Sequence, residues 1–241
     1  MKMNISVYRI LAVENGEAAE IFLELSNGRA SQQIKGTVSA AMFAALGLPL
    51  SLKEPLSVDM ERCEEILRCM KLYSAIKKGI YLLGYASNTA RTLSRKLKTK
   101  GYPDDIAEEA VVYLKEKGYI RERDDAVLFA EHLARHKLYG KNRIRKEMFV
   151  KGFPDDVIRE TLEIPEIDFS EICAKRIRAM GGCSTFDNTA EKNKAISALM
   201  RIGNLKDRPC EACEFHKENG CCKWNCVFDA LIYAKYNEEG R

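Results

Sequence analysis

The sequence lacks any long uninterrupted apolar stretch. Its most apolar run, residues 38–50, is broken by Gly47 and Pro49 and is too short to cross a bilayer as a helix. Near the start of the chain, polar residues such as Asn4 and Arg9 interrupt the apolar segment that a secretion signal would need. We therefore expect a cytoplasmic protein that makes no membrane contact.

A strong charge of one sign is also missing. The 241 residues include 39 Lys and Arg against 35 Asp and Glu, which gives a net charge of +4. With 46% hydrophobic and 31% charged residues, the chain falls in the ordinary globular class and is long enough for one or two domains. An excess this small does not indicate a nucleic-acid binder by itself, so the positions of the charges must decide. We expect a monomer.

Known catalytic motifs are absent as well. The sequence has no Gly-rich phosphate loop, no nucleophile elbow and no dinucleotide fingerprint. His132 and His136 have the spacing of two metal ligands on a helix, but no Glu follows His132 as in the metalloproteases and no third ligand lies nearby. Two partly exposed helix histidines are the better interpretation. We expect a non-enzymatic protein with no catalytic residue and no required cofactor.

The chain does contain a repeated helix joint. Residues 100–106 read KGYPDDI and residues 151–157 read KGFPDDV, at an offset of 51 residues. In each copy Gly favours the left-handed turn that ends a helix, and Pro at the first helical position followed by two Asp favours the start of the next. Apolar residues upstream repeat at the same offset: Leu93 and Leu97, then Ile144 and Met148.

The first part of the chain has a different period. Apolar residues alternate at 5–11 and 21–25, and Asn-Gly turn signals stand at 15–16 and 27–28. These patterns predict a three-stranded meander. Thr37 is expected to cap a short helix that follows it.

From Ser57 onward the period changes to that of a helix. One long apolar stripe is predicted first: Cys63, Ile66, Met70, Tyr73, Ile76, Ile80 and Leu83. Thr89 is expected to cap the next helix, and Gly118 to end the one after the joint. Helices at 124–136, 141–151 and 154–162 then form a second set, and Ala195, Leu199 and Gly203 mark a degraded third copy.

These patterns predict a mostly α fold in which tandem three-helix repeats form a curved helical array behind a small β-rich N-terminal unit. The expected units are a β-rich unit at 1–57, a first repeat at 58–118, a second repeat at 119–163, and a degraded third repeat at 164–241 that carries a Cys-rich insertion at about 205–226.

Basic residues recur on equivalent helices of the two repeats. Arg91, Arg95 and Lys98 share one helical face, and the second repeat carries Lys141, Arg143, Arg145 and Lys146. Such residues can simply complement a helix dipole and keep the surface soluble. Their repetition instead favours an acidic or polyanionic partner.

The nine Cys residues are expected to be thiols or metal ligands in a reducing compartment. Five of them cluster at 210–226, where Cys210 and Cys213 form a C-x2-C pair and Cys221 or Cys222 with Cys226 follows. Cys210, Cys213, Cys222 and Cys226 are the predicted ligands of a structural zinc. The alternative is an insertion with reduced thiols and no metal.

Further motifs lie in the second repeat: Asp124-Asp125, Phe129-Ala130, Tyr139-Gly140, Arg143-Ile144 and Lys151-Gly152. Together with the joint at 97–105 they resemble the RecX family of bacterial RecA modulators. The resemblance covers residues 58–163 and is weaker over 168–205. Thr92 departs from the family by replacing an acidic residue, and the Cys-rich insertion departs from it too.

The resemblance implies a regulator that binds the RecA filament and modulates recombination and ATP hydrolysis, with inhibition as the expected direction, in DNA repair and the SOS response. The predicted basic residues would contact RecA, single-stranded or double-stranded DNA, or both. The alternative function is direct DNA binding through helix-turn-helix units, although such readers usually gain symmetry by dimerising.

Overall fold

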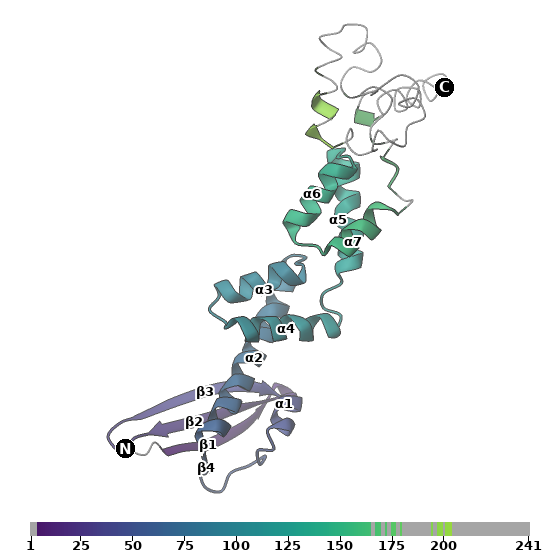
Figure 1. Cartoon of the computed structure of the whole chain (residues 1–241). Coiled ribbons are helices and arrows are strands. Elements are labelled where there is room, and N and C mark those ends of the chain that lie inside the picture. The colour runs from purple at the N-terminus through teal and green to yellow at the C-terminus, as the bar shows by residue number, and fades with distance from the viewer. Residues whose placement is uncertain are drawn as a thin grey trace. The chain divides into compact units, whose positions relative to one another are not determined.

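The computed structural model describes residues 4–164, 167–169, 172, 175–176, 179, 194, 197–199 and 201–203. The chain divides into two compact units, Met1–Ile120 and Arg121–Arg241 (Figure 1). The first unit contains a sheet and a three-helix set, and the second contains another three-helix set. The predicted fold class, mostly helical with a small N-terminal antiparallel sheet, is confirmed.

An antiparallel sheet forms the start of the first unit. Its strands are β1 (Asn4–Val13), β2 (Ala18–Ser26), β3 (Ser31–Ser39) and β4 (Leu56–Val58), in the order β3-β2-β1-β4. The predicted meander is β1, β2 and β3. Strand β4 was not predicted, because its three residues are too few to show an alternating pattern.

The short helix after the meander is α1 (Ala40–Ala45). The prediction that Thr37 caps it was wrong. Pairing of β3 with β2 continues to Ser39, so Thr37 still lies in the strand. Ser39 is the cap, and its Oγ accepts a hydrogen bond from the Met42 N–H at 3.2 Å.

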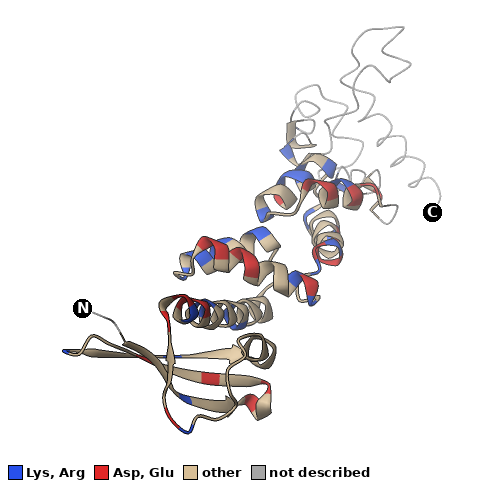
Figure 2. Cartoon of the chain, turned by 60° about the horizontal axis from the view of Figure 1, so that its bottom comes forward, with Lys and Arg blue, Asp and Glu red and all other residues tan. Residues whose placement is uncertain are grey.

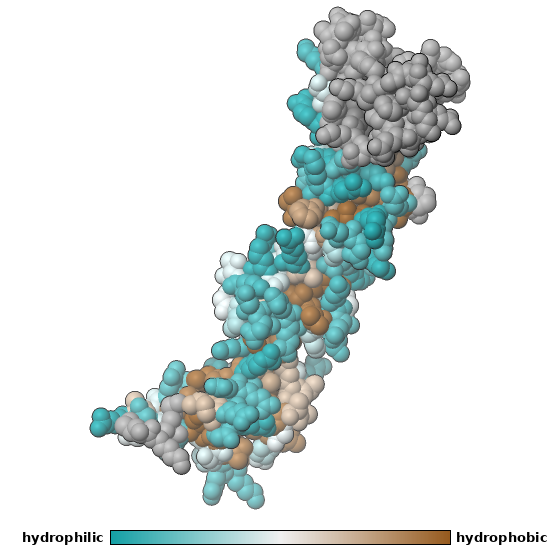
Figure 3. Space-filling model, viewed as in Figure 1, coloured by the Kyte–Doolittle hydropathy of each residue, from teal (hydrophilic) through white to brown (hydrophobic). Residues whose placement is uncertain are grey.

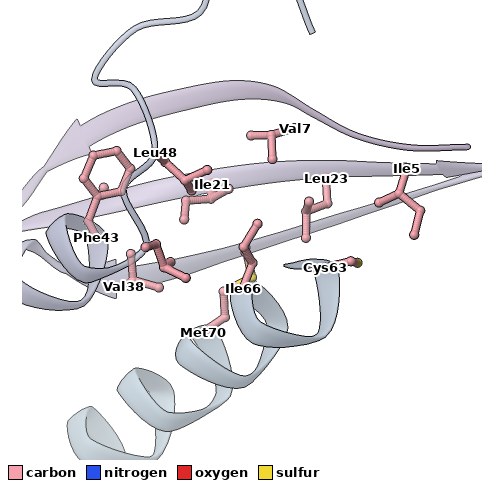
Figure 4. Close-up of a cluster of buried hydrophobic side chains, with 12 residues drawn as sticks. Ile5, Val7, Ile21, Leu23, Val38, Phe43, Leu48, Cys63, Ile66 and Met70 are labelled. Carbon is pink, nitrogen blue, oxygen red and sulfur yellow. The ribbon is translucent and has the colours of Figure 1, made fainter. Parts of the chain in front are cut away.

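Helix α2 (Met60–Tyr85) is long enough to serve two cores. It begins three residues after Ser57, because Ser57 is still paired with β1, and the Asp59 carboxylate accepts from the Arg62 N–H at 2.8 Å. Its first half packs Cys63, Ile66 and Met70 against the buried face of the sheet (Figure 4).

The second half of α2 turns its buried side to other helices. Leu72, Ala75 and Ile76 join the core formed with α3 (Ala90–Thr99) and α4 (Asp104–Glu116). The predicted stripe was therefore incomplete. Its last members, Ile80 and Leu83, are half-buried and pack against this core, but the stripe included Tyr73 and missed Leu72 and Ala75. A stripe with one period cannot follow a helix that changes partners midway.

Two glycines allow α2 to lie close to both partners. A Cβ at Gly36 of β3 would stand 2.7 Å from the Met70 sulfur, and a Cβ at Gly79 of α2 would stand 2.5 Å from a methyl of Leu114. Both distances are shorter than real carbon contacts, so neither site accepts a side chain without movement.

The second unit repeats the helix order of the first. Helices α5 (Glu122–Lys137), α6 (Lys141–Lys151) and α7 (Asp155–Leu162) pack in pairs as α2, α3 and α4 do. The repeated apolar residues occupy the centre of each core, and all four are fully buried: Leu93, Leu97, Ile144 and Met148.

The two joints share one hydrogen-bond pattern. Gly101 has φ +91° and Gly152 has φ +96°, the left-handed conformation that was predicted for both. The following residue closes the turn in each case, Tyr102 N–H to Leu97 O at 3.3 Å and Phe153 N–H to Met148 O at 3.1 Å. These are Schellman motifs, and Gly118 (φ +74°) ends α4 as predicted.

The prolines of the joints stand one position earlier than predicted. Pro103 and Pro154 are the N-cap residues of α4 and α7, with extended ψ of 152° and 149°. The Pro103 carbonyl accepts the first helical hydrogen bond, from the Ala107 N–H at 2.9 Å. A residue without an N–H is tolerated there because the cap nitrogen has no helical acceptor.

A short segment of the predicted third copy contacts α6. Leu199 is fully buried and Gly203 is left-handed at φ +82°, as in the two joints. The amides of Gly140 and Asn142 donate to the carbonyls of residues 202 and 203, at 2.8 and 3.3 Å. These carbonyls satisfy N–H groups at the start of α6, which has no side-chain cap. Ala195 lies outside the described residues.

Glycine-to-alanine changes should separate the roles of three glycines. Gly101→Ala should lower the free energy of unfolding by about 1–2 kcal/mol, because a left-handed residue with a Cβ is strained. Gly79→Ala should lower it by roughly 1–3 kcal/mol through overlap with Leu114. Gly84→Ala, in α2 with open space around it, should raise it by up to about 1 kcal/mol. Urea unfolding of the three variants checks these signs, and a stabilising Gly101→Ala would contradict the joint.

Candidate interaction surface

The basic residues of α3 differ in how far they are exposed. Arg91 and Arg95 are exposed. Lys98 instead reaches α4, where its ammonium lies 2.9 Å from Glu108 and 3.3 Å from Asp104. The hydrogen bond to Glu108 raises the pKa of Lys98, so this residue stays charged but is partly neutralised by its neighbours.

A further α3 lysine is held by a buried amide that sequence reasoning missed. Asn88 is only 2% exposed, and its amide nitrogen donates to the carbonyls of Leu82 and Ala86 at 3.1 and 2.6 Å. Its oxygen accepts from the Lys96 ammonium at 2.6 Å. Asn88 thus fixes the α2–α3 connection, and a polar residue next to a helix cap was the only signal of it.

The predicted basic residues of α6 are also divided. Lys141 pairs with Glu163 at 2.7 Å, and Arg143 pairs with Glu147 at 2.6 Å while lying over the Tyr139 ring. Arg145 is exposed. α3 has no acidic residue and α6 has only Glu147, so the other carboxylates that pair with these cations come from neighbouring segments. Figure 2 shows Lys and Arg together with Asp and Glu in both helix sets.

The exposed face of α6 combines cations with large apolar side chains. Arg145 and Lys146 lie one helical turn before Phe149 and Val150, so the four side chains share a face. Phe149 is 55% exposed and Val150 is 79% exposed. Figure 3 shows hydrophobic surface where α6 ends. We call these four residues the α6 surface. Sequence reasoning noted its cations and missed its apolar half.

The helix that follows each joint begins with acidic residues. Asp104 and Asp105 are exposed in the first turn of α4, and Asp155 and Asp156 are exposed in that of α7. Carboxylates are favourable there because they face the positive end of the helix dipole. In both units, therefore, the helix after the joint presents negative charge at its N-terminus.

The described residues contain no group of three or more metal-ligating side chains. His132 and His136 are both exposed, with ring centroids 4.9 Å apart, as the interpretation of two helix histidines predicted. The predicted zinc ligands Cys210, Cys213, Cys222 and Cys226 lie outside the described residues. No described helix is both long and apolar enough to span a membrane.

Comparisons with known proteins give the family. A family model described as "RecX, first three-helix domain" matches residues 75–114. A regulatory protein RecX from Stenotrophomonas maltophilia (strain R551-3) is 30% identical over 131 residues, which are 53% of this chain and 78% of the relative. The chain belongs to the RecX family.

Other RecX proteins are also similar to this chain, in sequence or in fold. A regulatory protein RecX from Caldanaerobacter subterraneus is 25% identical over 157 residues, covering 65% of this chain and 74% of the relative. A crystal structure of regulatory protein RecX shares the fold with a TM-score of 0.63 at 18% identity, over 83% of this chain and 94% of that one. The crystal structure of RecX from Lactobacillus salivarius has a TM-score of 0.53 at 13% sequence identity, over 69% of this chain and 97% of that one.

The match to the first RecX three-helix domain begins inside α2. Residue 75 lies where the buried side of α2 turns from the sheet to the helices, so the matched region corresponds to the first three-helix core. The relatives are named as regulatory proteins, in agreement with the prediction of a non-enzymatic chain.

The Lys141–Glu163 pair can be tested by titration. The hydrogen bond from Lys141 lowers the pKa of the Glu163 carboxyl in the folded state. The ion pair therefore stabilises the fold at pH values above the unfolded-state pKa of Glu163, and this stabilisation is lost as the pH falls through the lower folded-state pKa. Lys141→Met should raise the Glu163 pKa toward its ordinary value, as NMR of the side-chain carboxyl can measure. Arg145→Met is the matched control and should have a smaller effect. An unchanged Glu163 pKa in Lys141→Met would contradict the pair.

Proposed function

We propose that this RecX family member binds the RecA filament and inhibits its recombination and ATPase activities. The observation that carries the proposal is the α6 surface, where exposed cations adjoin exposed apolar side chains. Phosphates attract the cations but give Phe149 and Val150 nothing apolar to pack on. An acidic protein surface with apolar residues satisfies both halves.

The paired cations fit the same proposal. Lys98, Lys141 and Arg143 hold acidic residues of their own unit, so less of the predicted basic area is available to a long polyanion. Surface ion pairs contribute only about 0–1 kcal/mol each, so a partner can exchange with them at small cost. The exposed arginines Arg91 and Arg95 extend the proposed contact in the first unit.

The alternative of a direct helix-turn-helix reader is less well supported. Such a reader places the N-terminal residues of its second helix against base edges in the major groove. Here the helices after both joints begin with exposed Asp pairs, at 104–105 and 155–156, which DNA phosphates would repel. The proposed structural zinc at Cys210, Cys213, Cys222 and Cys226 stays a prediction.

The function can be tested with the DNA-dependent ATPase of RecA. The wild-type chain should lower the ATPase rate on single-stranded DNA. Arg145→Glu combined with Lys146→Glu should require at least about tenfold more protein for the same effect, because like charges facing each other across an interface cost several kcal/mol. Phe149→Ser combined with Val150→Ser should weaken the effect without altering the net charge.

A matched control is available in two connecting segments of the first unit, outside the strands. Arg29→Glu with Lys53→Glu makes the same change of charge at exposed positions and should inhibit RecA as wild type does. If this control variant loses inhibition to the same extent as the α6 charge variant, the loss comes from the change in net charge rather than from the α6 surface. Salt dependence then separates the partners, because removing one phosphate-binding cation flattens the log–log slope for single-stranded DNA by about 0.7. If both α6 variants inhibited RecA as fully as wild type does, the α6 surface could not be the contact with RecA.

A further inference from the structure

The outer edge of β3 borders a pocket that has no role in the proposed function. In the described part of the chain, β3 is paired on one side only, with β2. Every second residue of such an edge strand turns its N–H and C=O groups outward, where they can pair with another strand. The edge is nine residues long, Ser31–Ser39.

The pocket lies between this edge and α2 and has a volume of about 530 Å³. Ile34 and Gly36 of β3 line one side, and Leu67, Met70 and Lys71 of α2 line the other. A volume of this size is in the range of ligand sites, at roughly 300–1,000 Å³. Because Gly36 has no side chain, Met70 packs directly on the strand, and the apolar surface of Leu67 and Met70 adjoins the edge where a neighbouring strand would lie.

Ordered polar contacts close the pocket. The Glu14 carboxylate accepts from the Tyr73 hydroxyl at 3.0 Å and from the Lys77 ammonium at 2.8 Å, which ties the β1–β2 turn to α2. These two hydrogen bonds lower the pKa of Glu14. At another part of the rim, the Ser74 and Tyr102 hydroxyls are 2.9 Å apart. The pocket is therefore preformed rather than a gap between loose chains.

The charges at the edge favour an acidic partner. Lys35 stands at the centre of β3 among the residues that line the pocket, and its side chain is 68% exposed. Its acidic partner Glu20, at 3.6 Å, also lines the pocket. Lys71 is exposed at the pocket and has no acidic partner among the described residues. An acidic residue on an added strand would meet Lys35 directly.

The position of Lys35 also disfavours a second copy of this chain. Antiparallel pairing of Ser31–Ser39 with itself over its full length places Lys35 opposite Lys35, because residue 35 is the midpoint of the strand. Like charges directly opposite each other destabilise a strand pair, and natural edge strands use Lys in this way to avoid self-pairing.

We propose that the β3 edge and the adjoining pocket bind an extended segment of another protein by adding it to the sheet as a fifth strand. The segment carries an acidic residue opposite Lys35 and apolar residues on either side of it. Those apolar side chains point into the pocket beside Met70, and the backbone pairs with β3. This surface is independent of the RecA contacts proposed above.

The probe for the test is a nine-residue blocked peptide with Glu at its centre, Leu on either side, and alternating Thr and Ile outward. Fluorescence anisotropy with the full chain should show saturable binding. Lys35→Glu should weaken binding by about three- to tenfold, and a peptide with central Lys should regain it. Lys71→Glu should weaken binding of the Glu peptide about threefold, and Lys53→Glu is the control that should not change it.

Backbone pairing needs its own test. Two versions of the peptide are N-methylated at alternate residues, so that each loses one set of N–H groups. A peptide paired with β3 must lose binding in one version and keep it in the other. Equal binding of both versions, absence of charge-swap rescue, or no binding of the unmethylated peptide overturns the proposal. A concentration-dependent dimer that competes with the peptide would assign the edge to a second copy and overturn it too.

Discussion

Helix α2 must pack on two unlike surfaces, a twisted sheet and a pair of helices. It meets the first demand with Cys63, Ile66 and Met70 and the second with Leu72, Ala75 and Ile76. Close contact is possible at both ends because Gly36 lies under Met70 and Gly79 lies under Leu114. Burying a large aliphatic side chain contributes roughly 1.5–3 kcal/mol, so the two halves of α2 hold the first unit together.

The sequence predicted most of this fold because its strongest signals are local. A left-handed Gly followed by a helix start occurs twice, 51 residues apart, and the same hydrogen bonds close the turn at both joints. The failures have tertiary causes. Thr37 looked like a cap, yet strand pairing extends to Ser39, and the single stripe along α2 ignored the change of packing partner at residue 72.

The candidate interaction surface was predictable only in part. Spacing placed Arg91, Arg95 and Arg145 correctly on exposed helix faces, but it did not reveal that Lys98 and Lys141 have carboxylate partners distant in sequence. Such pairs depend on how helices pack, which no local pattern encodes. The exposed apolar half of the α6 surface was missed because the sequence analysis considered only the apolar residues that recur at the offset of 51, Ile144 and Met148. A surface of mixed character fits a protein partner better than DNA alone, and the acidic starts of α4 and α7 agree with that.

Hydrogen exchange measured on the whole chain tests most directly whether α2 unites the sheet with the first three-helix core. If it does, buried amides of β2, of both halves of α2 and of α4 will exchange through one cooperative opening with a common free energy. Denaturant will then lower that free energy with the same slope at all of them. Exchange of β2 through a smaller, separate opening, while the second half of α2 and α4 stay protected, would show that the sheet is an independent unit and would contradict this account.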